Sequence, residues 1–105
     1  MGPGKLQIGA GQVSASGNTT LITPALGKSL RVYYCSYNPK GAVEAAFRFG
    51  PTGLLFLQND IPANSVIAKD FGDFRYLEGA GGEPCMLNLS QGVVTNWTVF
   101  YLEAP

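Results

Sequence analysis

Hydrophobic and polar residues alternate in short runs along most of this chain, and each run ends before a helix could be completed. The runs are rich in β-branched and aromatic side chains, and 14 Gly and 7 Pro residues separate them. Branched and aromatic side chains pack well on a pleated sheet, whereas Gly and Pro favour turns. The clearest predicted strands cover residues 28–37, 42–50, 65–70, 85–90 and 93–103. The chain is therefore predicted to be an all-β protein.

Weaker alternation adds strands of lower regularity. It predicts two edge strands separated by Gly9 and Gly11, at 5–8 and 12–16, and further strands at 19–23 and 54–57. About eight strands with one long irregular connection, residues 71–84, predict a single-domain antiparallel β-sandwich that resembles a jelly roll. An immunoglobulin arrangement fits less well, because Trp97 follows both cysteines instead of lying between them. Residues 1–4 are expected to be a flexible lead-in to a domain over 5–105.

The alternation also assigns side chains to the two faces of each strand, because successive side chains point to opposite sides of a sheet. In 42–50, the core face is predicted to hold Val43, Ala45, Phe47 and Phe49. In 28–37, one face is predicted to hold Leu30, Val32 and Tyr34, and the other Arg31, Tyr33, Cys35 and Tyr37. In 93–103, one face is predicted to hold Val93, Thr95, Trp97, Val99 and Tyr101.

Four aromatic side chains are expected on faces opposite the main core residues of their strands: Tyr33, Tyr37, Trp97 and Tyr101. Such rings could stack on sugars or bases. More often they complete a two-sided core or anchor a subunit interface, and this structural role is favoured here.

Composition restricts the possible partners. The chain has 105 residues, enough for one core, and its seven basic and seven acidic residues cancel. No broad electrostatic field is then available to attract nucleic acid or an anionic membrane, so neither is expected as a partner. Charged residues make up 13% of the chain, well below the usual share of about 25%. Apolar surface is therefore expected to remain for a protein partner. No apolar run has the length of a signal peptide or a membrane span, so the chain is expected to be soluble and made in the cytoplasm.

The side chains of common active sites are scarce. The sequence contains no His, which removes the commonest general acid–base group and metal ligand, so no enzyme, metal site or cofactor is predicted. Asp70 with Asp73, or Glu78 with Glu83, could form a carboxylate pair, but solvated loop charges are favoured. Cys35 and Cys85 are expected to be buried free thiols, although a disulfide between them is left open.

Four segments carry a resemblance to a known class of proteins. Residues 30–37 (LRVYYCSY), 65–74 (SVIAKDFGDF), 78–84 (EGAGGEP) and 98–103 (TVFYLE) make the chain similar to small all-β virion proteins of tailed bacteriophages, of the kind that decorate capsids. The resemblance implies a sandwich that binds the outside of an icosahedral shell, often as a trimer, and joins neighbouring capsomers. It implies no catalytic residue, and it implies the major capsid protein or another virion component as partner.

The sequence and this resemblance together predict a structural virion protein, a capsid decoration or cement protein that stabilises the assembled shell. The alternative is a carbohydrate- or receptor-binding module of a tail fibre or baseplate, and a small sandwich enzyme comes third. Contacts with the partner are expected from the long connection and from an N-terminal arm. The predicted contact residues are Phe71, Phe74, Arg75, Tyr76 and Glu78, together with Lys5, Leu6 and Gln7.

Overall fold

The computed structural model describes residues 6–50, 55–61, 65–71 and 75–105. All regular structure in these ranges is β, which confirms the predicted fold class. Within them there is no helix of a length and hydrophobicity that could cross a lipid bilayer. The strands are β1 (Gln7–Val13), β2 (Gly17–Ile22), β3 (Ser29–Pro39), β4 (Val43–Phe49), β5 (Leu55–Ile61), β6 (Ile67–Asp70), β7 (Leu77–Glu78), β8 (Cys85–Leu89) and β9 (Thr95–Ala104).

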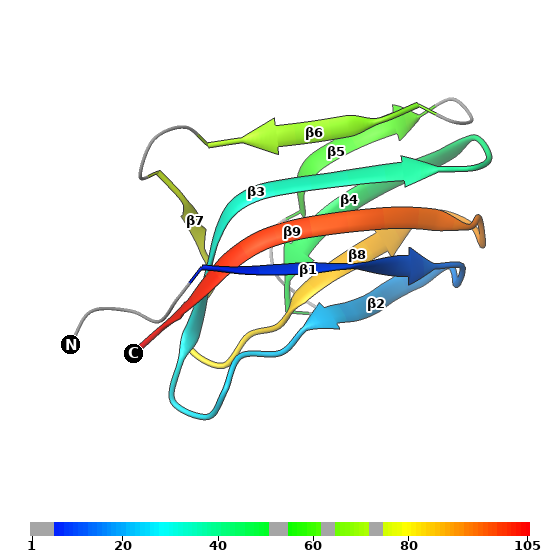
Figure 1. Ribbon diagram of the computed structural model, residues 1–105. Helices are drawn as coiled ribbons and strands as arrows, with labels where there is room; N and C mark the ends of the chain where they lie inside the picture. Colours follow the sequence, from blue (N-terminus) through cyan, green and yellow to red (C-terminus); the bar gives the residue numbers. More distant parts are fainter. Residues whose placement is uncertain (1–5, 51–54, 62–64, 72–74) are drawn as a thin grey trace.

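The strands form two antiparallel sheets that stack as a sandwich (Figure 1). Sheet A has the order β1-β9-β3-β6, with β7 also paired to β3, and sheet B has the order β2-β8-β4-β5. The pairs β4–β5, β3–β6, β2–β8 and β1–β9 are nested, as in one long antiparallel ribbon. Wrapping this ribbon adds the pairs β3–β9 and β4–β8. This is the strand arrangement of a jelly roll, as the sequence predicted.

The core lies between the two sheets. Sheet A contributes Leu30, Val32 and Val99 to it, and all three side chains are fully buried. The core face predicted for β4 is confirmed, because Val43, Ala45, Phe47 and Phe49 are all buried. The two faces predicted for β9 are separated as expected, but the expectation that Trp97 and Tyr101 lie opposite the core residues of this strand is wrong, because their face is the inner one. Thr95 and Val99 are buried there, and Val93, Trp97 and Tyr101 pack against the core.

The face assignment predicted for β3 is wrong beyond Val32. The register with β9 shifts between Val32 and Tyr34, so an extra residue, Tyr33, lies in β3 at a β-bulge. Cys35 and Tyr37 are consequently buried on the core side with Val32, while Tyr34 is only half-buried. One inserted residue reverses the inside–outside alternation of everything that follows it, because side chains alternate with a period of two.

Three predicted boundaries also differ from the structure. The two edge strands predicted around Gly9 and Gly11 form one strand, β1, which pairs with β9 along its whole length. β5 extends to Ile61, although 59–61 had the composition of a loop. The connection predicted as irregular contains β7 and follows β3, since Gly79 N donates to Leu30 O and Gly82 N to Lys28 O. The predicted lead-in, residues 1–4, lies outside the described residues.

Candidate interaction surface

The outer faces of the two sheets differ in character. On sheet B, outward positions carry mostly polar or charged side chains, among them Glu44, Arg48 and Asn88, beside the apolar Ala46 and Met86. Asn88 Nδ2 donates to Asn18 Oδ1 at 2.8 Å. On sheet A, the outward positions of the central strands and of β1 carry aromatic and aliphatic side chains at one end. The outer face of sheet A is therefore the more apolar of the two at this end.

A row of large side chains crosses sheet A. Ile8 on β1 lies opposite Phe100 on β9, and Phe100 lies opposite Tyr34 on β3. The rings of Tyr34 and Phe100 are 4.9 Å apart between centroids, and Ile8 is 68% exposed. Leu102 follows two residues later on the same face of β9, and continuing the β1–β9 register places Leu6, 51% exposed, opposite it. We call these five side chains the apolar patch.

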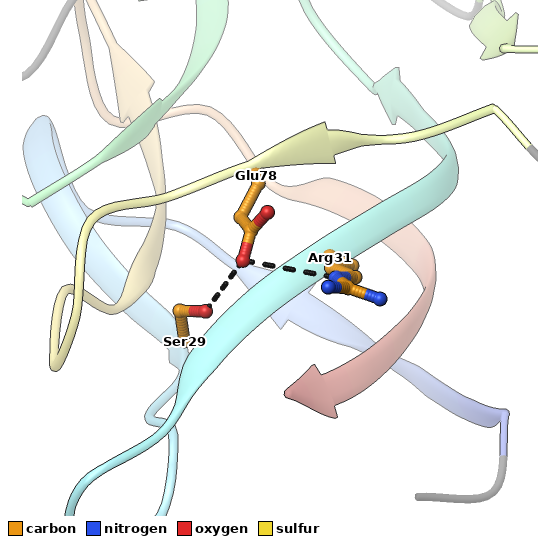
Figure 2. Close-up of polar contacts among 3 residues, drawn as sticks. All are labelled: Ser29, Arg31 and Glu78. Atoms are coloured by element: carbon orange, nitrogen blue, oxygen red, sulfur yellow. Dashed lines mark hydrogen bonds and ion pairs between the residues drawn. The ribbon is translucent and has the colours of Figure 1, made fainter. Parts of the chain in front are cut away.

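The apolar patch is bordered by a second group at the place where β7 joins β3. The Arg31 guanidinium carbon lies 4.7 Å from the centroid of the Tyr76 ring, a cation–π contact. Tyr33 and Tyr76 pack with their ring centroids 5.3 Å apart. Figure 2 shows Glu78 in contact with both Ser29 and Arg31. Its Oε2 accepts a hydrogen bond from Ser29 Oγ at 2.8 Å and lies 3.7 Å from Arg31 Nε. We call Ser29, Arg31, Tyr33, Tyr76 and Glu78 the Arg31 cluster.

The ion pair in the Arg31 cluster contributes little to stability. The side chains of Arg31 and Glu78 are 27% and 39% exposed, and an exposed ion pair contributes only about 0–1 kcal/mol. Arg31 Nε is buried and has no hydrogen-bond partner among the described residues, because Glu78 is too distant for one. The Tyr76 ring contacts Arg31 and Tyr33 in this cluster, and 38% of the residue remains exposed.

The predicted contact residues are only partly brought together. Tyr76 and Glu78 meet in the Arg31 cluster, and Arg75 beside them is exposed. Phe71 is instead half-buried against the core, its backbone N donates to Tyr33 O, and Lys69 Nζ lies 6.0 Å from its ring centroid. It therefore belongs as much to the fold as to a contact surface.

The contact residues predicted in a flexible N-terminal arm do not all lie in such an arm. Leu6 belongs to the apolar patch, whereas Gln7 is already the first residue of β1. The Tyr101 hydroxyl donates to Gln7 Oε1 at 3.3 Å. Two of the predicted contact residues, Lys5 and Phe74, lie outside the described residues.

The four aromatic residues that could have stacked on sugars or bases do not share one exposed surface. Tyr37 is buried, and its hydroxyl donates to Leu57 O at 2.6 Å. Trp97 packs on the inner side of β1, where a Cβ added to Gly9 or Gly11 would lie 3.3 Å from its indole. Tyr101 also packs against the core, so only Tyr33 points outward. The alternative that these rings complete the core is confirmed for Tyr37, Trp97 and Tyr101.

The two thiols are free and buried, as predicted. Burial raises the pKa of Cys35 to about 12. Burial, and secondarily the charge of a Cys35 thiolate, raises the pKa of Cys85 to about 12. A thiol with such a pKa is a poor nucleophile at neutral pH. Among the described residues no three His, Cys, Asp or Glu side chains gather in a group that could hold a metal ion.

Several members of this surface were not predicted as contact residues: Ile8, Arg31, Tyr34, Phe100 and Leu102. The two-residue alternation of 93–103 already put Phe100 and Leu102 together on one face, but it did not show that this face is the outer one. Tyr34 could not be found in this way, because the β-bulge at Tyr33 changes its face. No protein-family model and no curated protein sequence matches the chain.

Proposed function

We propose that this chain is a structural virion protein of a tailed bacteriophage, which decorates the capsid and stabilises the assembled shell. In this proposal the apolar patch and the exposed ring of Tyr76 bind the major capsid protein or another virion component. Binding to the assembled state and not to separated subunits adds stability by mass action. The trimer implied by the resemblance stays a prediction.

The observation that carries this proposal is the unequal character of the two outer sheet faces. Exposed Ile8 and Leu6 continue into half-buried Phe100, Tyr34 and Leu102, so one face offers contiguous apolar surface. The opposite face carries more polar and charged side chains, which suits the solvent side of a bound protein. The jelly-roll fold recurs in viral capsid proteins, but also in lectins and cupins, so it supports the role only by analogy.

The test is to heat capsid shells that lack this protein, with and without the purified chain at saturating occupancy, and to follow their melting by differential scanning calorimetry. We expect bound chain to raise the melting temperature of the shell. Equal melting temperatures at demonstrated saturation would contradict a cementing role, and failure of the chain to bind shells would contradict decoration.

A matched pair of variants locates the binding face. Tyr76→Ala removes a partly exposed ring of sheet A and is expected to weaken shell binding while the isolated chain stays folded. Thr20→Ala changes an exposed position of β2 in sheet B and is expected to bind as the wild type does. Equal binding of both variants would show that Tyr76 does not contribute to the contact with the shell.

A carbohydrate- or receptor-binding module of a tail fibre or baseplate is the second candidate. It is favoured by one feature, the exposed Tyr76 ring beside Arg31 and Glu78, since sugars stack on aromatic rings and hydrogen-bond to charged side chains. Screening the isolated chain on a glycan array separates the candidates. Specific binding that Tyr76→Ala abolishes would favour this second function over decoration.

A further inference from the structure

β1 is an edge strand that lacks the usual protection against pairing. It pairs with β9 on one side and with no described strand on the other. Only Val13 of its seven residues is buried. The free side of an edge strand presents unpaired N–H and C=O groups, and proteins commonly protect it with charged residues, Pro or a covering segment. The sequence of β1, QIGAGQV, contains neither a charge nor a Pro.

The opposite edge of sheet A is protected. β6 carries Lys69 and Asp70, and exposed Arg75 follows it. By contrast, no charged residue occurs anywhere in residues 6–27, which include β1 and the edge strand of sheet B, β2. Both strands lie on the same side of the sandwich (Figure 1). One side of the molecule thus has charged edge strands, and the other has none.

The sequence of β1 is also nearly self-complementary about its centre. If two copies align antiparallel with Ala10 facing Ala10, then Gly9 faces Gly11 and Ile8 faces Gln12. The glycines leave no side chains to hinder pairing on either side of the central alanines. A contact of this kind is isologous, because the same residues serve on both copies, and a twofold axis passes between the two Ala10 residues.

We propose that β1 pairs antiparallel with β1 of a second copy of this chain, joining the two A sheets into one continuous sheet. The apolar patches of the two copies then lie on the same face of that sheet. This dimer differs from the trimer implied by the resemblance, since a contact in which β1 meets β1 closes after two copies and cannot build a ring of three. The inference does not rest on the proposed function.

The test measures the mass of the full chain in solution by sedimentation equilibrium, without shells. We expect the wild type to approach twice the 11.1 kDa of one chain as its concentration rises. Ala10 is exposed, so Ala10→Lys and Ala10→Glu are expected to fold, which circular dichroism checks. Each variant alone is expected to lose the two-chain species, because residues directly opposite have Cβ atoms about 4.5–5.5 Å apart and like charges then repel.

Mixing the two variants makes the test specific for the twofold register. An equimolar mixture of Ala10→Lys and Ala10→Glu is expected to recover the two-chain species, because opposite charges then face each other. The control is Ala68→Lys, an exposed position on β6 at the other edge of sheet A, which is expected to keep the wild-type mass.

Four results would overturn the proposal: a single-chain or a three-chain mass of the wild type, an Ala10→Lys variant with wild-type mass, or a mixture that does not recover the dimer. A second measurement needs no substitution. Amide hydrogen exchange of β1 in the wild type is expected to slow as protein concentration rises, and exchange independent of concentration would also overturn the proposal.

Discussion

A single buried aromatic residue links the two sheets of this protein at a point where one of them is irregular. Tyr37 comes from β3 in sheet A, and its hydroxyl reaches Leu57 O and Ala45 O in sheet B, at 2.6 and 3.1 Å. Leu57 has a φ of 54°, in the left-handed region, where the β4–β5 register shifts. A buried tyrosine needs a partner for its hydroxyl, and an irregular strand presents a carbonyl that the ladder does not use. The two requirements are met by one contact.

The two buried thiols make stability depend on pH at the alkaline end. The pKa of each rises from 9.0 to about 12 on folding, so the folded chain retains these protons more tightly than the unfolded chain. Their contribution is complete below pH 9 and is lost as pH rises toward 12. We expect the free energy of unfolding to fall over this window, by up to about 1.4 kcal/mol per pH unit for each thiol.

Urea denaturation under reducing conditions at a series of pH values from 8 to 11 measures this fall. The control is the double variant Cys35→Ala/Cys85→Ala, in which the remaining decline reports the other titrating groups. We expect it to be less stable at pH 8, because of the cavities, but to show a shallower decline above pH 9. Parallel declines in the two proteins would contradict this expectation.

At the level of elements, the described part of the connection after β6, residues 75–82, runs beside β3 and includes β7 of sheet A. β7 pairs with Arg31 and Val32, and the hydrogen bonds of Gly79 and Gly82 continue the contact along β3. This pairing fixes Tyr76 and Glu78 relative to Arg31. The surface that they form therefore belongs to the edge of sheet A.

Close packing where β7 ends gives a testable pair of substitutions. A Cβ at Gly79 would lie 2.6 Å from Cδ1 of buried Phe49, whereas a Cβ at Gly81 would meet nothing within 4 Å. We expect Gly79→Ala to destabilise the fold by about 1–3 kcal/mol, because the Phe49 ring must move within a packed core. Gly81→Ala is expected to be neutral or slightly stabilising.

Chemical denaturation of both variants measures the difference. Phe49 stacks on Phe56 with their ring centroids 5.3 Å apart, so the cost of Gly79→Ala extends into the aromatic part of the core. Equal stability of the two variants would show that β7 and the chain after it can move away from the sandwich at little cost.

At the scale of the whole molecule, the two sheets share one core, and neither sheet can bury its apolar face alone. We expect a single cooperative unfolding transition, since loss of either sheet exposes the other. Far-UV circular dichroism reports both sheets, and the fluorescence of Trp97, which packs on β1, reports the edge of sheet A. Coincident transitions are expected. An earlier fluorescence transition would show that β1 unfolds separately, and the single-domain prediction would then need revision.

The faces and edges of the sandwich show how the two proposals relate to each other. The sandwich has one polar outer face, one outer face with an apolar patch, one charged side and one uncharged side. Pairing through β1 would cover the uncharged side and leave the apolar patch open for a larger partner. The two contacts use different surfaces of sheet A, its edge and its face, so each can be tested without the other.

Much of the fold could be predicted from local pattern alone. The strands β4 and β9 have the side-chain faces that alternation indicates, because the two-residue period is a property of the pleated backbone itself. The jelly-roll class followed from the number of strands and one long connection. Of the ten residues in the apolar patch and the Arg31 cluster, the sequence singled out three for contacts: Leu6, Tyr76 and Glu78.

What the sequence by itself determined was therefore the all-β class, a core from two sheets, and a chain without histidine chemistry. Only the tertiary structure decided which side of β3 faces inward after Val32, that β1 runs unbroken through Gly9 and Gly11, and which sheet exposes its aromatic side chains. The physical reason is that alternation is local, whereas a bulge or a strand through glycines depends on the partner strand. Here β9 is that partner in both cases, and it lies more than fifty residues from each along the chain.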